Sequence, residues 1–142
     1  MTHPVPAGPD RIERPDVPVM ERATVDALPQ IQQLWPEFET LVGLRGRRMF
    51  ARVDEAAQTY TVCTPIKDGD DPGALGLEVG VLAGGAYLRT RIAGEPEELF
   101  ERVGAEMTQL VAAAGDARDH SRPLIEHYAR RNALQLWVPV RP

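Results

Sequence analysis

The chain has 142 residues, the usual size of one domain, and its 43% hydrophobic and 26% charged residues are typical of a globular protein. Its formal net charge is −5 at pH 7 and its basic residues are dispersed among acidic ones, so we expect no direct contact with nucleic acid, which normally requires a basic face. No apolar run approaches the roughly 20 residues of a membrane span, so we expect no membrane partner.

Cysteine usage and the N-terminal segment both favour a cytoplasmic protein. The single cysteine, Cys63, cannot form an internal disulfide, and its apolar surroundings are typical of a small buried strand residue. The proline-rich start has neither the basic region nor the apolar core of a signal peptide. We therefore predict a disordered tail over residues 1–10, a single domain over residues 11–142, and a cytoplasmic location.

The first half of the chain predicts a strand, a helix and a pair of strands. In chain order these are a strand over residues 11–24, a helix over 25–43, and strands over 48–53 and 58–66. Pro15 and Pro18 should break or bend the first strand. Asp26 is the expected N-cap of the helix, and Pro36 should bend or split it.

The second half predicts two hairpins separated by the longest helix. Residues 67–76 form a surface connection, followed by a hairpin of 77–82 and 86–92 across Gly84-Gly85, a helix over 95–115, and a hairpin of 123–128 and 134–140. The helix has Pro96 and two glutamates at its start, where the helix dipole favours negative charge.

An internal repeat indicates how these elements combine. Residues 47–66 align without a gap onto residues 121–140, and each block follows a helix that ends in glycine and closes with proline and a β-branched residue. We therefore predict an α+β fold of two tandem strand–helix–strand–strand units, over about residues 11–66 and 77–141. Pairing of the units buries a common core and leaves a central cleft, a favoured place for a ligand.

The second unit resembles a known family. Its helix over residues 97–115, the Glu126-His127-Tyr128 strand and the final Val138-Pro139-Val140 triplet resemble the GyrI-like small-molecule-binding domain, the effector-binding domain of BmrR-type regulators. The resemblance covers about residues 11–141. It implies a curved antiparallel sheet with two helices, a ligand between the two units, and a Glu126 side chain that points into the cavity. The chain lacks the helix-turn-helix of the longest members, so we expect a stand-alone domain.

The resemblance leaves three functions open. Drug-binding members of the family face hydrophobic cations with this glutamate, which implies a protein that sequesters or senses an aromatic, cationic or drug-like compound, with self-resistance as one use. Some relatives are hydrolases that open cyclopropane rings of DNA-alkylating natural products, which would make Glu126 catalytic beside an aromatic residue. Others bind gyrase, which implies an inhibitor of a partner protein. We expect a monomer or homodimer and no cofactor.

Glu126 is also the sharpest candidate from the residues alone. Alternation along its apolar strand places Glu126 and Tyr128 on one face. A carboxylate facing an apolar cavity is costly unless it has a partner or takes up a proton. A cationic ligand would be such a partner, whereas a raised pKa would suit a general acid or base. The competing interpretation is that Glu126 faces solvent or pairs with Arg122 or Arg130.

Four further aromatic residues are candidate ligand contacts, because aromatic walls suit a flat cation. Trp35 and Phe38 lie on the first helix, at a spacing that is more often typical of core residues than of a ligand-binding wall. Tyr60 could instead hold a structural hydrogen bond. Trp137 faces the pocket if it pairs directly with Glu126, and the core if the register slips by one residue.

No metal site is expected. The three histidines have no zinc-ligand spacing, and His127 alternates away from Glu126. The aspartate-rich loop at residues 68–71 lacks the distal glutamate of an EF-hand, so we interpret it as a solvated loop.

Overall fold

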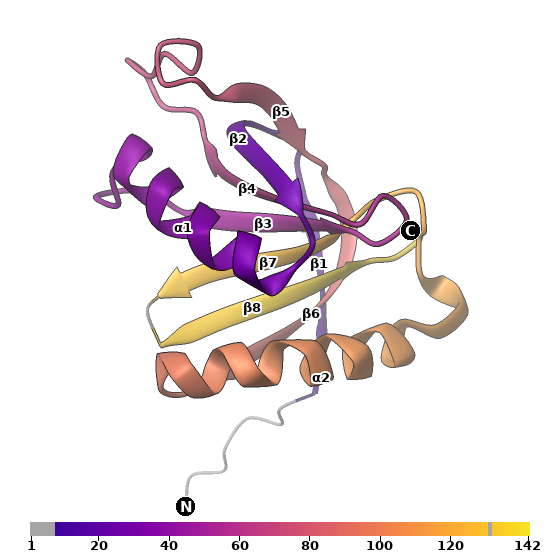
Figure 1. Ribbon diagram of the computed structural model, residues 1–142. Coiled ribbons are helices and arrows are strands. Elements are labelled where there is room, and N and C mark those ends of the chain that lie inside the picture. Colours follow the sequence, from indigo (N-terminus) through magenta and orange to yellow (C-terminus); the bar gives the residue numbers. More distant parts are fainter. Residues whose placement is uncertain (1–7, 131) are drawn as a thin grey trace, which may run out of the picture.

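Two α-helices and eight strands are present in the described part of the chain, residues 8–130 and 132–142 of a computed structural model (Figure 1). The elements are β1 (Asp10–Arg14), β2 (Val17–Val25), α1 (Leu28–Val42), β3 (Met49–Asp54), β4 (Thr59–Pro65), β5 (Glu78–Leu82), β6 (Gly85–Ala93), α2 (Pro96–Ala114), the short 3-10 helix η1 (Gly115–Ala117), β7 (Leu124–Arg130) and β8 (Ala133–Pro139). The predicted tail lies outside the described residues up to residue 7, and Asp10 already belongs to a strand.

All eight strands form one antiparallel sheet in the order β1-β6-β8-β7-β3-β4-β2-β5. The sequence β2-α1-β3-β4 makes one half of the sheet and β6-α2-β7-β8 makes the other. The halves meet where β3 pairs with β7, with Ala51 directly opposite Glu126. The α+β fold with two strand–helix–strand–strand units is therefore confirmed.

The two remaining strands are exchanged between the halves. β1 precedes the first half in the chain but pairs with β6 of the second, and β5 precedes the second half but pairs with β2 of the first. The predicted strand over residues 11–24 is thus two strands at different places in the sheet. The hairpin predicted for residues 77–92 is wrong, because β5 and β6 are not neighbours.

Gly84, which suggested this hairpin, lies instead where two connections between strands come into contact. The Gly84 amide donates to Asp16 Oδ1 at 2.6 Å. A Cβ at Gly84 would lie 2.5 Å from the Arg14 carbonyl oxygen, a distance that no side chain tolerates. Gly84 is therefore required because the β1–β2 and β5–β6 connections touch each other, and close backbone approach is a signal that resembles a tight turn in sequence.

The first helix differs from its prediction at its start. Ala27 is the N-cap of α1 and no side chain caps it, while Asp26 lies outside the helix with its amide donating to Gln58. The helix runs unbroken through Pro36, which is exposed, so that water can reach the carbonyl group that the proline leaves without an amide donor. Leu34 and Phe38 are the buried residues on its inner side.

The second helix matches its prediction closely. It begins with Pro96 as one of its first residues, carries Glu97 and Glu98 in its first turn, and ends at Gly115 with a positive φ of 52°. Its buried residues pack against β6 and β8. Among the described residues, neither helix is both long enough and apolar enough to cross a membrane.

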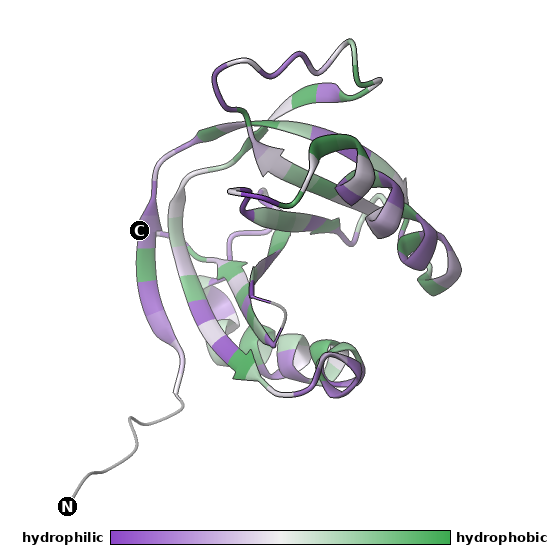
Figure 2. Cartoon of the chain, turned by 90° about the vertical axis from the view of Figure 1, so that its left-hand side faces the viewer, coloured by the Kyte–Doolittle hydropathy of each residue, from purple (hydrophilic) through white to green (hydrophobic). Residues whose placement is uncertain are grey.

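The core lies on both faces of the sheet. On the helix side, one hydrophobic cluster lies under α1 and another under α2, and Val53 and Tyr128 pack against both. On the opposite face, a third cluster draws residues from all eight strands, including Ile12, Phe50 and Trp137. The sheet curls around this third cluster as a half-barrel (Figure 2), and the two helices lie on its other face.

Candidate ligand-binding site

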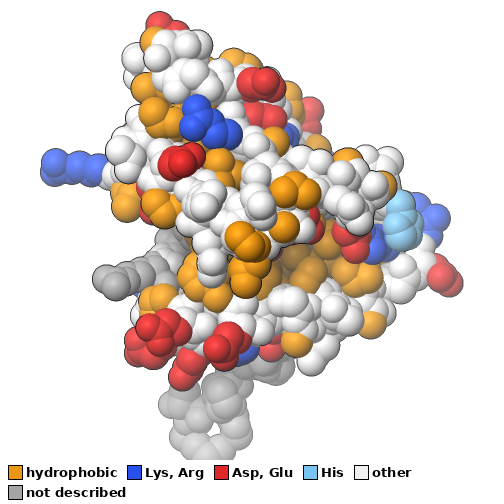
Figure 3. All heavy atoms as spheres, in the orientation of Figure 1, with side chains coloured by type: hydrophobic (Ala, Val, Ile, Leu, Met, Phe, Trp, Pro, Cys, Tyr) orange, Lys and Arg blue, Asp and Glu red, His pale blue; other side chains and the backbone are white. Residues whose placement is uncertain are grey.

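A cavity opens where the two halves of the molecule meet. It has a volume of about 600 Å³ and is lined by α1, α2 and the central strands β3, β4 and β7. Its walls are mainly aliphatic, with Ile31 from α1, Leu124 from β7 and Met107 from α2. Figure 3 shows hydrophobic side chains gathered in the hollow above α2. The predicted central cleft is therefore present, and an apolar cavity of this size suits a small molecule.

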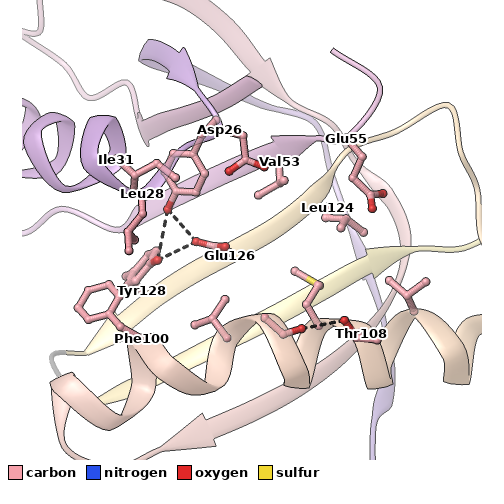
Figure 4. A pocket seen from close by; sticks show the side chains of 15 residues that line it. Asp26, Leu28, Ile31, Val53, Glu55, Phe100, Thr108, Leu124, Glu126 and Tyr128 are labelled. Atoms are coloured by element: carbon pink, nitrogen blue, oxygen red, sulfur yellow. Dashed lines mark hydrogen bonds between the residues drawn. The ribbon is translucent and has the colours of Figure 1, made fainter. Parts of the chain in front are cut away.

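Glu126 lies at the floor of this cavity. It is only 7% exposed, and its Oε1 accepts hydrogen bonds from the hydroxyls of Tyr60 and Tyr128, each at 2.7 Å. The two hydroxyls lie 3.3 Å apart, so the three groups form a closed triangle (Figure 4). No described residue donates to the second carboxylate oxygen, Oε2, which points away from the tyrosines. The triangle therefore holds the carboxylate in place and leaves one oxygen for a ligand.

Trp35 extends this network from α1. Its indole Nε1 donates to the Tyr60 hydroxyl at 3.1 Å, and its ring lies edge-on to Tyr128 with centroids 4.9 Å apart. The Tyr60 hydroxyl accepts a hydrogen bond from the indole and donates one to the carboxylate, so it acts as both acceptor and donor. Tyr60 is thus fixed by partners on two sides, and the first helix is tied directly to the position of Glu126.

The surroundings of Glu126 favour its protonated form. Burial raises the pKa of Glu126, and the two tyrosine hydrogen bonds oppose this effect in part. Asp26 raises the pKa of Glu126 further through charge repulsion. Burial also raises the pKa of Tyr60 and of Tyr128, so both tyrosines remain hydroxyl donors. A nearby cation would relieve the cost of charging Glu126, and none of the described residues supplies one.

The charges that line the cavity are all negative. Asp26, Glu55 and Glu126 contribute carboxylates, and no lysine, arginine or histidine is among its described lining residues. Glu55 at the rim has its own partner, because it forms an ion pair with Arg118. Asp26 and Glu126 have no such partner among the described residues. The cavity therefore presents an apolar, aromatic surface with net negative charge.

A second lobe adjoins this cavity. It also measures about 600 Å³ and shares Phe100 and Tyr128 with the first lobe. Trp35, Arg47 and Arg130 are among its other lining residues. We call the cavity at Glu126 the acidic lobe and the cavity at Arg130 the arginine lobe.

The structure brings most of the predicted site residues together. Glu126, Tyr60 and Tyr128 line the acidic lobe, and Trp35 lines the arginine lobe. Phe38 does not reach either lobe, since it is fully buried in the cluster under α1. Its expected role as a ligand contact is corrected to a core role, because its position on α1 turns it towards the sheet.

Trp137 also requires a correction. β8 pairs with β7 so that Leu136 lies opposite Glu126 and Trp137 lies opposite Ile125. Trp137 consequently faces the third cluster, where its ring contacts Phe50, at 5.7 Å between centroids. It cannot line the acidic lobe, because successive side chains of a strand point to opposite faces.

The alternative partners of Glu126 are also resolved. Arg122 donates to three backbone carbonyls and pairs with Asp119, and it makes no contact with Glu126. Arg130 lines the neighbouring lobe and forms no ion pair with a described carboxylate. The interpretation of Glu126 as one member of an internal salt bridge is therefore wrong.

Most of the cavity residues were not anticipated from the sequence, among them Asp26 and Phe100. Asp26 was expected to cap a helix, and Phe100 was not among the candidate ligand contacts. Phe100 is 63% exposed although it is aromatic. The sequence signal that could have revealed Phe100 is the width of the apolar stripe on α2. Leu99 and Leu110 of this stripe are buried in the core, whereas Phe100 and Val111 line the cavity.

Comparison with known proteins places this site in a known fold. No family model and no curated protein sequence matches the chain. Solved structures do match: an integron cassette protein from the mobile metagenome of Vibrio cholerae has a TM-score of 0.71 at 17% identity, covering 94% of this chain and 96% of that one. SAV2435 bound to tetraphenylphosphonium has a TM-score of 0.62 at 15% identity, covering 94% and 93%. A hydrolase from Listeria innocua has a TM-score of 0.59 at 15% identity, covering 94% and 92%.

The chain shares their fold. At these identities the likeness concerns the α+β half-barrel with its two helices, as the resemblance to GyrI-like domains implied. Residues 8–130 and 132–142 contain no group of three or more His, Cys, Asp and Glu side chains that could hold a metal ion. The chemistry of the site therefore has to be argued from the carboxylate, the tyrosines and the apolar walls.

Proposed function

We propose that this protein binds a hydrophobic, aromatic cation in the acidic lobe, as a stand-alone module that sequesters or senses the compound. The observation that carries the proposal is Glu126, a buried carboxylate held by Tyr60 and Tyr128 that has no basic partner among the described residues. A bound cation would supply the missing charge. The Oε2 atom is the group it would approach.

The walls of the lobe suit the rest of such a ligand. Aliphatic side chains favour burial of aryl groups, at about 25 cal/mol for each Å² removed from water. Tyr128 and Phe100 offer ring faces to which a cation is attracted. A delocalised cation loses less hydration on entering such a site than a compact ammonium does. The fold neighbour solved with tetraphenylphosphonium supports the proposal, since that compound belongs to this class.

Calorimetric titration with tetraphenylphosphonium tests the proposal directly. We expect saturable binding to the wild type and a loss of at least tenfold, about 1.4 kcal/mol, in Glu126→Gln. Glu101→Gln is the matched control, because Glu101 is exposed on α2 and lines neither lobe. Neutral triphenylphosphine oxide should bind both variants alike. Equal affinity of wild type and Glu126→Gln for the cation would contradict the proposal.

A second candidate function uses the same carboxylate as a catalyst. Oε2 has no described protein donor, and burial raises the pKa of Glu126, two properties that suit a group which activates water. A hydrolase is among the fold neighbours. On this account the protein opens the strained ring of a cyclopropane-bearing alkylator, with Tyr128 as the adjacent aromatic residue.

Mass spectrometry distinguishes the two candidates. A hydrolase should convert a cyclopropane-bearing alkylator to a product heavier by one water, and Glu126→Gln should abolish turnover while retaining affinity for the compound. A binding module should return the compound intact. Intact compound together with tight cation binding would exclude the catalytic candidate for that substrate.

A further inference from the structure

The two lobes of the cleft differ in charge. The charged side chains that line the acidic lobe are all carboxylates, whereas the arginine lobe has Arg47, Arg130 and Glu39 in its lining. Because Phe100 and Tyr128 belong to both lobes, one elongated ligand can contact both. The charges of the arginine lobe therefore favour one kind of chemical group at the far end of the ligand.

Arg47 has its charge already balanced. Its guanidinium forms a two-pronged pair with the Asp70 carboxylate, at 2.6 and 2.7 Å, and also donates to the Val42 carbonyl. Its side chain is only 10% exposed. The hydrogen bonds from Arg47 and, secondarily, from the Lys67 amide lower the pKa of Asp70 to about 2, so this carboxylate is charged beside Arg47 at neutral pH. Arg47 is thus part of the wall and is not a free recognition group.

Glu39 does not neutralise the remaining arginine. Burial raises the pKa of Glu39. Glu39 and Arg130 both line the arginine lobe, but they form no ion pair with each other. Arg130 is exposed, and no described carboxylate contacts it. Of the two arginines in the described lining of the arginine lobe, Arg47 is paired with Asp70 and Arg130 forms no ion pair.

Arg130 and Glu126 lie on the same strand. They are four residues apart on β7, and at about 3.3 Å per residue their backbones are separated by roughly 13 Å. Tyr128 stands between them and lines both lobes. The spacing matches an aryl cation joined through a short tail to a second charged group.

We propose that the natural ligand is bipolar, with an aromatic cationic head at Glu126 and an anionic group, such as a carboxylate, at Arg130. This inference rests on the proposed function of the acidic lobe and adds the class of the ligand. The head provides the main part of the affinity, because its lobe is lined mainly by apolar side chains. The pair with Arg130 is solvent-exposed, so it contributes modestly and selects between ligands that share a head.

Alkyltriphenylphosphonium ions with and without a terminal carboxylate test the inference. Two series of increasing tail length, one ending in methyl and one in carboxylate, are titrated into the wild type, Arg130→Gln and Arg102→Gln. Arg102 is an exposed arginine of α2 that lines neither lobe, and it serves as the control. At one optimal length the carboxylate should bind the wild type about two- to fivefold more tightly than the methyl tail. Arg130→Gln should remove this preference and Arg102→Gln should keep it.

A charge reversal adds an independent readout. Arg130→Glu should invert the preference, so that a tail ending in ammonium binds better than one ending in carboxylate. Both preferences should weaken at high salt, because the pair is exposed. A wild type that binds both tails equally at every length, or a preference unchanged by Arg130→Gln, would overturn the inference while leaving the acidic lobe intact. Failure of the methyl series to bind the wild type would refute the proposed function itself, and the bipolar ligand with it.

Discussion

The two faces of the central strands bury polar and aromatic side chains in opposite ways. On the helix side, Glu126, Tyr60 and Tyr128 surround a cavity, and a carboxylate oxygen is left without a protein donor. On the opposite face, Trp137 and Phe50 are almost fully buried in a cluster that receives side chains from every strand. The recess beside Trp137 holds only about 10 Å³, roughly one water molecule.

We call the helix side, which has the cavity, the open face and the side with the third cluster the closed face. One face of the sheet is thus available for binding, and the other mainly stabilises the fold. Adjacent residues of β7 serve the two faces alternately, so Ile125 packs the closed face while Glu126 faces the open one. His127 returns to the closed face, stacked on Phe50 at 4.3 Å between centroids, where burial lowers the pKa of the imidazole and favours its neutral form. The third cluster thus buries a neutral imidazole, whereas the helix side buries a carboxyl group whose charge a ligand can pair.

The largest expected effect comes from the closed face. Trp137→Ala should lower the free energy of unfolding by about 3–5 kcal/mol, because it leaves a void among residues from all eight strands. Chemical denaturation measures this loss. Titration of the folded fraction with tetraphenylphosphonium should show affinity within about twofold of the wild type. A large loss of affinity in the folded variant would contradict the separation of the two faces.

Tyrosine substitutions in the triangle should have smaller and unequal effects. Tyr60→Phe removes a donor from Glu126 and the acceptor of the Trp35 indole, whereas Tyr128→Phe removes a donor alone. At about 1–2 kcal/mol for a hydrogen bond to a charged or buried group, Tyr60→Phe should be the more destabilising of the two in thermal melts. Equal losses would show that the indole contact contributes little.

The smallest effect on stability is expected for Glu126→Gln, and it should depend on pH. Burial raises the pKa of Glu126 in the folded state above its unfolded value, so the wild type loses stability as pH rises through the range between the two values. Below the unfolded value the two proteins should melt alike, and above the folded value the glutamine variant should melt higher. Thermal melts from pH 4 to pH 8, with Glu101→Gln as reference, measure this trend. A wild type that gains stability over the variant as pH rises would reverse the sign of the argument.

The sequence predicted the elements better than their partners. Periodicity located α2 and the β3–β4 and β7–β8 hairpins, because each depends on residues close in the chain. The exchange of β1 and β5 between the halves could not be predicted, since period-two patterning identifies a strand and carries no information on which strand lies beside it. Gly84 supplied a misleading signal, because a touching crossover and a tight turn require the same residue.

Register explains the successes and errors at the site. The gapless repeat aligns Tyr60 with Leu134, and both residues face the helices. It aligns Arg52 with Glu126, but Arg52 lies opposite Ile125 and faces the side of the third cluster, so β3 and β7 depart from the alignment by one residue. The irregular pairing between His127 and Arg130, together with the shorter second turn, accounts for this one-residue shift. The same one-residue uncertainty concealed the face of Trp137, whereas the position of Glu126 in an apolar strand was visible from its neighbours.

The central claim is that the cavity uses the charge of Glu126, and proton release on ligand binding tests it most directly. Tetraphenylphosphonium is titrated at slightly acidic pH in buffers of different ionisation enthalpy, which yields the number of protons exchanged. Because burial raises the pKa of Glu126 and a cation beside Oε2 lowers it, the wild type should release protons on binding and Glu126→Gln should release none. The same proton count for both proteins, or proton uptake by the wild type, would contradict the account.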